Sequence, residues 1–193
     1  MCSSDLVLAP ALPRSIEDKP SIAAGLLLLL SFAIGQTIDE VKIERLDRIY
    51  PPGRNQGSID FKLVCLLPSQ VQVHLGICIL PFTDLELVNE VCNRLLVYKD
   101  FGLDRLCLLR QSDAITDLRQ LPPCLPKLLS PDIGGHLIPL RSPDILTILT
   151  ALSVFRHKQQ HGVTNKMIYA YLLQEQLLIK NQLIKSILAI TQF

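Results

Sequence analysis

Histidine pairs are the first place in this sequence where side-chain type and spacing could support metal chemistry. His157 and His161 are four residues apart, which would place both on one face of a helix, where two imidazoles can bind the same metal ion. No third ligand lies within reach in the sequence. We interpret the pair as the solvated end of a helix, with metal binding as the alternative, and we expect neither a metal site nor a cofactor.

The six cysteines are distributed in a way that favours a structural role. None forms a Cys-x-x-Cys pair, so no zinc site is predicted, and most lie inside apolar runs such as KLVCLL and LGICIL. This setting predicts small core residues in a reducing compartment. Cys124 differs because it lies in a proline-rich segment, but nothing in the sequence identifies a base that would activate it as a nucleophile.

Motifs of known catalytic and nucleotide-binding sites are absent from the sequence. There is no G-x-S-x-G elbow, H-E-x-x-H pair, Walker A loop or G-x-G-x-x-G, and Gly134-Gly135-His136 is interpreted as a loop. The acidic residues Asp104, Asp113, Asp117 and Asp132 are scattered and do not suggest a catalytic carboxylate pair. We therefore expect a protein that is not an enzyme. The alternative is an α/β enzyme in which the segment 111–142 covers a site near Asp113 and His136.

Charge and aromatic content argue against a nucleic-acid partner. The net charge is only +1, aromatic residues make up 5% of the chain and tryptophan is absent. Such a chain has neither the basic surface that contacts phosphates nor the aromatic platforms on which bases stack.

The most hydrophobic stretch, IAAGLLLLLSFAIG at residues 22–35, raises the question of a membrane anchor or signal peptide. A membrane-spanning helix needs about 20 apolar residues. This run is shorter, and the charged residues Lys19 and Asp39 lie close to its two ends. The preceding residues are also more acidic and proline-containing than a signal peptide would be. We favour a segment buried in a soluble domain, and the alternative is a membrane-anchored or secreted protein that uses residues 22–35.

Composition and periodicity divide the chain into a loosely ordered N-terminal arm, residues 1–20, and a single domain, residues 21–193. The arm contains prolines and one short run, LVLA, that could add an edge strand. At the start of the domain, SIAAG predicts a buried strand that ends at Gly25, and Leu26–Ile34 predicts a helix that stops at Gly35. Residues 51–58, PPGRNQGS, predict a loop.

The middle of the chain has the pattern of an α/β sheet. Ile59–Leu67 and Val71–Leu80 predict two strands joined as a hairpin by the short link PSQ. Thr83, with Glu86 three residues later, predicts the capping box of a helix that ends before Gly102, and Leu103–Leu109 predicts the next strand. The apolar face of this helix is expected to consist of Leu85, Val88, Val91, Cys92, Leu95 and Leu96.

The C-terminal part is expected to contain a long connection, a strand and two helices. Residues 111–142 carry five prolines and predict the connection. Ser142 as N-cap and Pro143 at the first helical position predict a helix that stops at His161-Gly162. Met167–Leu172 predicts a strand, and Gln174–Ile190 predicts a final amphipathic helix. The apolar face of the first helix is expected to consist of Ile145, Ile148, Leu149, Leu152 and Phe155.

Four stretches of the chain, taken in order, resemble the proteasome assembly chaperone 1 family. They are KPSIAAGLLLLLSFAIG, VQVHLGICILPFTDLELVNEVCNRLL, LDRLCLLRQSDAITD and LRSPDILTILTALSVFRHKQQHGVTNKMIYAYLLQE. The last is the most specific, because it is similar to the family's pattern of Pro-Asp/Asn-hydrophobic, an Ala-Ser helix, Gly-hydrophobic and a strand with tyrosine. In this chain these positions are Pro143, Asp144, Ile145, Ala151, Ser153, Gly162, Val163 and Tyr169.

The resemblance implies a three-layer α/β domain with a central mixed sheet flanked by helices. It also implies a non-catalytic chaperone of the cytoplasm and nucleus that forms a heterodimer with proteasome assembly chaperone 2 and holds proteasome α subunits during ring assembly. Some members insert a C-terminal tail of the form hydrophobic-Tyr-any residue between α subunits. This chain ends in Ile190-Thr191-Gln192-Phe193 and lacks that tyrosine, so Phe193 is its only aromatic residue there.

Excess apolar residues in the two C-terminal helices predict the partner-binding surface. The candidates are the helix over 143–155 and the helix over 174–190, although the second has the pattern of an ordinary core helix as well. The residues expected to bind the partner are Pro143, Asp144, Ile148, Phe155, Tyr169 and Phe193.

Overall fold

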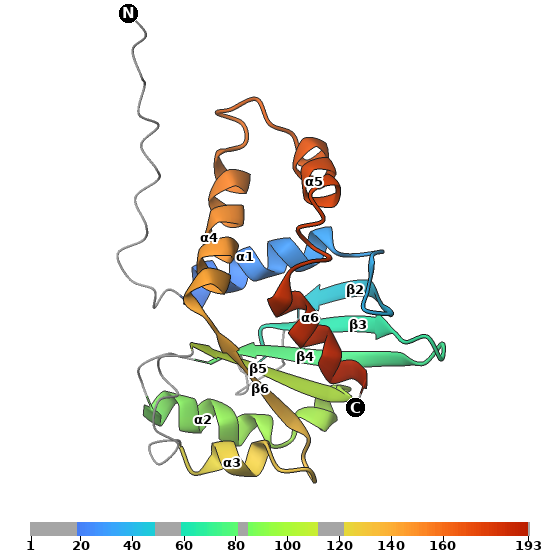
Figure 1. The fold of residues 1–193 in the computed structure, drawn as a ribbon. Coiled ribbons are helices and arrows are strands. Elements are labelled where there is room, and N and C mark those ends of the chain that lie inside the picture. The colour runs from blue at the N-terminus through green and yellow to red at the C-terminus, as the bar shows by residue number, and fades with distance from the viewer. Residues whose placement is uncertain (1–18, 49–58, 81–84, 112–121, 193) are drawn as a thin grey trace, which may run out of the picture.

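The computed structural model describes residues 19–48, 59–80, 85–111 and 122–192 (Figure 1). The elements in chain order are α1 (Lys19–Phe32), β1 (Thr37–Ile38), β2 (Val41–Arg48), β3 (Phe61–Leu66), β4 (Gln72–Ile79), α2 (Leu85–Leu95), the 3-10 turn η1 (Tyr98–Phe101), β5 (Arg105–Gln111), α3 (Cys124–Leu128), β6 (Gly135–Leu140), α4 (Ser142–His157), α5 (Asn165–Gln174), α6 (Gln182–Ala189) and the 3-10 turn η4 (Ile190–Gln192).

A six-stranded mixed sheet forms the centre of the fold, with its strands in the order β1-β2-β3-β4-β5-β6. The first four strands are antiparallel to their neighbours, whereas β4, β5 and β6 are parallel. The predicted β3–β4 hairpin and the predicted strand-helix-strand unit β4–α2–β5 are both confirmed. The fold therefore belongs to the expected α/β class.

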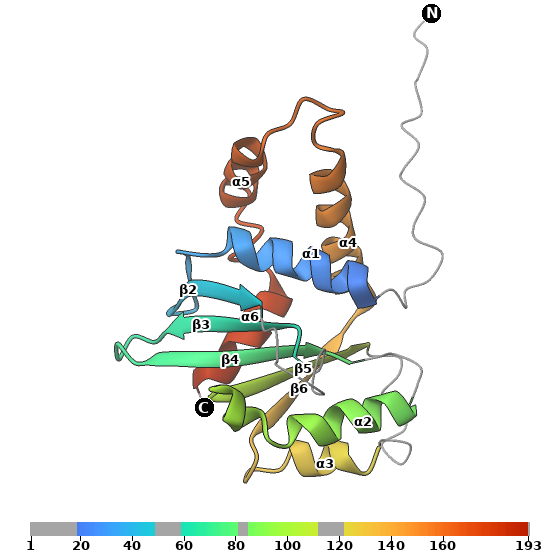
Figure 2. The same ribbon diagram turned by 180° about the vertical axis from the view of Figure 1, so that it is seen from behind.

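Helices cover both faces of the sheet, which gives three layers (Figures 1 and 2). On one face, α1, the first half of α4 and α6 bury side chains such as Leu26, Ile148 and Ile187 against the sheet. On the other face, α2 and α3 bury Val88, Cys92 and other apolar side chains. The second half of α4 and the whole of α5 extend beyond α1, away from the sheet (Figure 1). These two helices therefore have surface that the sheet does not cover.

Residues 19–32 form one helix, so the predicted strand over SIAAG is wrong. Pro20 lies in the first turn of α1, where a missing N–H costs nothing. Gly25 does not end an element but lies at the crossing of α1 and α4, where a Cβ atom would be 2.6 Å from the Ile148 carbonyl oxygen. The chain turns after α1 at Gly35, as predicted, with φ of 83°.

Most of the apolar run at residues 22–35 belongs to this buried helix, which ends at Phe32. Ile22, Leu26, Leu29 and Leu30 of α1 are buried in the core. In the ranges that the structure describes, no helix has both the length and the apolar composition needed to cross a membrane, and α1 itself has 14 residues.

Two parts of the sheet are absent from the sequence-based prediction. The β1–β2 hairpin turns at Asp39 and Glu40, which have φ of 45° and 71°, and glutamate stands where such a turn usually has glycine. A bulge at Glu44 then interrupts the apolar alternation of β2. Strand β6 and helix α3 lie within the segment 111–142 that was expected to be a long connection. Pro139 is tolerated in β6 because this strand is at the edge of the sheet.

The C-terminal elements also differ from the expectation. Met167–Leu172 lies in helix α5 rather than in a strand, because the Thr164 side chain caps the helix by accepting a hydrogen bond from the Met167 N–H at 3.2 Å. The single helix expected over Gln174–Ile190 is broken between α5 and α6, and Asn181 caps α6. The N-cap of α4 is Arg141 rather than Ser142, and Asp144 accepts its backbone N–H at 3.0 Å.

A partly buried ion pair connects the start of α1 to the sheet. The Asp60 carboxylate lies 3.3 Å from Lys19 Nζ and accepts the Ile79 N–H at 2.7 Å. Burial raises the pKa of Asp60, and the Lys19 charge partly opposes this rise. Because the pKa is raised, the contribution of Asp60 to the free energy of unfolding is fully present below its ordinary pKa and is lost as pH rises through the folded value.

Replacing Lys19 with methionine is expected to lower the free energy of unfolding by about 1–2 kcal/mol at about pH 7. The carboxylate of Asp60 then remains buried without its cation, which raises its pKa further. The loss should be smaller at about pH 4, because the raised pKa of Asp60 leaves a larger share of this carboxyl group uncharged at low pH. Urea unfolding at both pH values measures the difference. Lys42→Met, on an exposed side chain, serves as the control, and an equal loss at both pH values would contradict the expectation.

A candidate partner-binding groove

An apolar groove of about 750 Å³ lies between α4 and α5, with α1 as its floor. Its walls also include the segment between α5 and α6. The apolar side chains that line it are Leu28, Leu29, Phe32, Pro143, Leu146, Ala151, Val154, Ile168, Tyr171, Leu172, Leu177 and Leu178. A groove of this size and composition is suited to bind apolar groups of a ligand or of a partner protein.

Helix α4 forms one wall because it has apolar residues on two sides. Ile145, Ile148 and Leu152 face the core and are buried. Leu146 and Val154, two turns apart, face the groove instead and are 51% and 50% exposed. A helix that is apolar on both sides buries one side in its own domain and leaves the other to be covered.

Aromatic packing holds α5 opposite α4. The ring of Phe32 on α1 lies edge-on to Phe155 of α4, with centroids 6.3 Å apart, and is stacked on Tyr169 of α5 at 6.1 Å. The Tyr169 hydroxyl also accepts a hydrogen bond from the Gln36 side chain at 2.9 Å. These contacts leave Tyr171, which is 59% exposed, on the groove side of α5.

The residues expected from the sequence to bind a partner have different positions in the fold. Pro143 and Asp144 line the groove. Ile148 is 1% exposed and packs in the core, so it offers a partner no surface in this structure. Phe155 and Tyr169 are used to join α4 and α5 through Phe32. Phe193 lies outside the described residues.

Sequence reasoning missed the residues that give the groove its exposed apolar surface, namely Leu146, Val154, Tyr171 and Leu177. The sequence of α4 did indicate Leu146 and Val154, because these two residues and Thr150 form a second stripe at four-residue spacing beside the buried one. Tyr171 and Leu177 could not be placed because the predicted strand and the predicted single helix were both wrong there.

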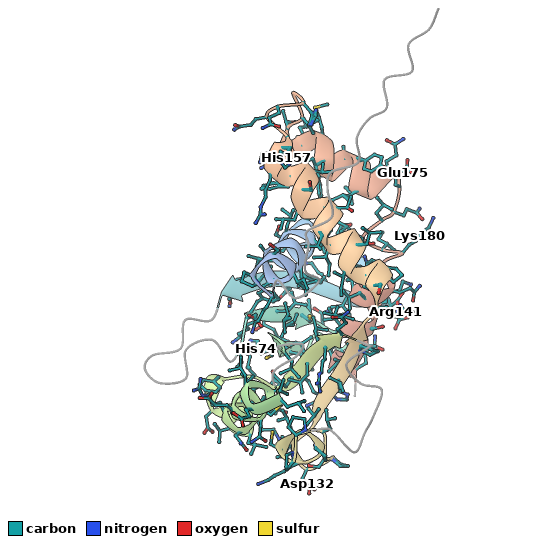
Figure 3. All side chains as sticks on the ribbon, turned by 90° about the vertical axis from the view of Figure 1, so that its left-hand side faces the viewer. His74, Asp132, Arg141, His157, Glu175 and Lys180 are labelled. Atoms are coloured by element: carbon teal, nitrogen blue, oxygen red, sulfur yellow. The ribbon has the colours of Figure 1, made fainter. Side chains whose placement is uncertain are left out.

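One end of the groove carries basic side chains. Arg141 and Lys180 both line it, and Figure 3 shows them on the same side of the molecule. The single carboxylate in the lining, Asp144, accepts hydrogen bonds from the Arg141 backbone N–H at 3.0 Å and from Arg141 Nε at 3.2 Å. The Lys180 ammonium forms no ion pair with any residue that the structure describes.

A second, more polar hollow of about 420 Å³ lies where the enzyme alternative would place a site. His136 lines it together with Arg105 and Tyr98, and burial lowers the pKa of His136, with the Arg105 charge as a second cause. The Tyr98 hydroxyl donates a hydrogen bond to the Ile133 carbonyl at 2.7 Å. Asp113 lies outside the described residues. No carboxylate is among the described residues that line this hollow.

The two histidines considered as metal ligands do not share a helix face. His157 is the last residue of α4, and its Nδ1 lies 2.9 Å from the Ser153 carbonyl oxygen, whereas His161 follows in the turn after the helix. Within the described ranges, no group of three His, Cys, Asp or Glu side chains is placed to hold a metal ion.

The structure buries every cysteine that it describes, which confirms their expected place in the core. Cys124 is 6% exposed, and its thiol donates a hydrogen bond to the Asn89 carbonyl at 3.4 Å. Burial raises the pKa of Cys65 and of Cys92 to about 12 and also raises that of Cys124. Thiols in this state are protonated at neutral pH and are poor nucleophiles.

We expect iodoacetamide to alkylate these thiols at least about a hundred times more slowly in the native protein than in the urea-unfolded protein at neutral pH. Mass spectrometry of timed samples measures the rate at each cysteine. A Cys2→Ser variant removes the cysteine outside the described residues. Fast native alkylation of Cys124 would contradict the expectation and would favour the enzyme alternative.

Strand β5 ends with a buried cation that the sequence pattern did not reveal. Arg110 is 2% exposed, and its Nε and Nη1 atoms have no hydrogen-bond partner among the described residues. Burial lowers the pKa of this guanidinium. In the sequence, Arg110 continues the run LDRLCLLR, where a charged last residue normally indicates that a strand has reached solvent.

No model of a known protein family matches the sequence, and no curated protein matches it either. The groove and its lining are therefore the observations on which a functional proposal rests, together with the resemblance of the four stretches described above.

Proposed function

We propose that this protein is a non-catalytic assembly chaperone that forms a heterodimer with proteasome assembly chaperone 2 and helps proteasome α subunits to assemble into a ring. The observation that carries the proposal is the apolar groove between α4 and α5, which exposes Leu146, Tyr171 and Leu177. An exposed apolar surface of this kind marks a protein-binding site more often than a catalytic one.

The place of the groove in the sequence supports the same proposal. Its α4 wall and most of its α5 wall belong to the stretch LRSPDILTILTALSVFRHKQQHGVTNKMIYAYLLQE, the most specific part of the resemblance to the proteasome assembly chaperone 1 family. We further propose that the protein acts in the cytoplasm and nucleus, where proteasome subunits would be its partners.

Co-expression with proteasome assembly chaperone 2 tests the proposal. We expect the two chains to co-purify through an affinity tag on this protein and to elute together in gel filtration as a one-to-one complex. In cells, the tagged protein should also recover free proteasome α subunits. Purification of this chain without chaperone 2 and without α subunits would overturn the proposal.

A further inference from the structure

The basic end of the groove defines the chemistry of the segment that would occupy it. We infer that the groove binds an amphipathic helix of a partner protein that places a carboxylate side chain against Arg141 and Lys180. This inference rests on the proposed function in so far as the groove is taken to be a docking surface. It adds which secondary structure and which charge the docking segment must have.

The walls of the groove favour a helix over an extended segment. They are formed mainly by α1, α4 and α5, most of whose backbone N–H and C=O groups are bonded within each helix, and by the turns between α5 and α6. A bound strand gains its affinity from backbone hydrogen bonds to an open sheet edge, and the groove has no such edge. A helix needs only apolar side chains at positions i, i+3, i+4 and i+7, and this groove accepts such side chains along its length.

The length of the groove sets the length of the docking helix. Its lining on α4 extends from Pro143 to Val154, which corresponds to about 17 Å along the helix axis. A partner helix that runs along this wall would therefore contact it over about three turns, or about eleven residues. The floor residues Leu28 and Phe32, one turn apart on α1, would contact its apolar face.

Charge determines which end of the groove the acidic residue of the partner would meet. Arg141 is 59% exposed at its side chain, but its Nε is already bonded to Asp144, whose side chain is only 12% exposed. Lys180 is exposed and lacks such a counterion among the described residues. This end of the groove thus has two cations, Arg141 and Lys180, and one carboxylate, Asp144, which is already bonded to Arg141. An acidic side chain of the partner would provide Lys180 with a counterion, whereas a basic one would be repelled.

Two synthetic peptides that differ at one residue test the inference on the full-length protein. Each has about fourteen residues, is helical, and carries leucine at spacings of three and four, with a glutamate at one end in the first peptide and a glutamine there in the second. A second pair of peptides has the glutamate or glutamine at the other end, because the direction of the helix is not set by charge alone. Fluorescence anisotropy measures the affinity of each labelled peptide.

We expect the glutamate peptide to bind about five to ten times more tightly than its glutamine twin, and this preference to shrink as salt is raised. Lys180→Glu should remove or reverse the preference. Lys166→Glu, which changes an exposed lysine of α5 outside the groove lining, should leave it unchanged. Equal binding of the two peptides, or no binding of either, would overturn the inference. It would also be overturned if this chain formed a dimer that Leu146→Asp dissociates, because a second copy of the chain would then occupy the groove.

The peptide experiment and the co-purification experiment can fail separately. If chaperone 2 does not co-purify but the glutamate peptide binds with the expected dependence on Lys180, the identity of the partner is wrong and the chemistry of the groove stands. If chaperone 2 co-purifies and Lys180→Glu has no effect on that complex or on the peptides, the proposed function stands and the inferred charge recognition is wrong.

Discussion

Replacing Gly25 with valine is expected to lower the free energy of unfolding by about 3 kcal/mol or more, the largest stability change that we expect from any single substitution considered. A Cβ atom at this position would lie 2.6 Å from both the Cγ2 atom and the carbonyl oxygen of Ile148. The side-chain atom can move, but the carbonyl oxygen belongs to the backbone of α4. The two helices must therefore separate, and separation opens the core between them.

The effect of alanine at the same position separates steric conflict from helix propensity. Alanine is more favourable than glycine in a helix by about 1 kcal/mol, so an exposed Gly→Ala change would stabilise the protein. At residue 25 we expect a net loss instead, because even one methyl group meets the Ile148 carbonyl.

Chemical denaturation of the valine and alanine variants measures both effects. Ser31→Val, on the exposed face of the same helix, introduces the same side chain without this conflict and should change the stability by only about 0.5 kcal/mol. Ile148→Ala should rescue Gly25→Val only in part, since it leaves the carbonyl oxygen in place. A gain of stability on Gly25→Ala would show that α1 and α4 are not as close as described.

Gly25 also illustrates why part of the fold could not be predicted from the sequence. In SIAAGLLLLL, a glycine after apolar and small residues is an equally good indication of a strand end and of a close helix crossing. Only the contact with Ile148, more than a hundred positions away, decides between them. By contrast, the β3–β4 hairpin and the β4–α2–β5 unit were predictable because their apolar runs and turn residues are local.

The groove was predictable to a similar, limited degree. The helix that begins at Pro143 could be identified as a candidate partner surface because its apolar residues exceed what one buried face requires. Which of them are exposed depends on the position of α1, which buries Ile148, and on that of α5, which faces Leu146. The roles of the aromatic residues of α5 were harder to predict. Tyr169 and Tyr171 are only two positions apart, but Tyr169 packs on Phe32 whereas Tyr171 lines the groove.

Replacing Leu146 with aspartate is expected to weaken binding of proteasome assembly chaperone 2, and of the glutamate peptide, by about thirtyfold or more. Leu146 is 51% exposed and lies in the apolar lining of the groove. An apolar side chain near the centre of a docking surface contributes about 2 kcal/mol or more to binding when it is fully covered. The new carboxylate would also have to be desolvated and would repel the acidic residue of the docking helix.

The exposed position of Leu146 allows loss of binding to be separated from loss of folding. Because half of the Leu146 side chain is already exposed to water, the free energy of unfolding of the variant should differ from that of the unchanged protein by no more than about 0.5 kcal/mol. Leu85→Asp is the matched control, because Leu85 is 43% exposed and lies on α2, across the sheet from the groove. If the groove is the docking surface, Leu146→Asp must weaken binding by about thirtyfold or more while Leu85→Asp leaves it unchanged. Equal binding by both variants would place the partner on another face of the molecule.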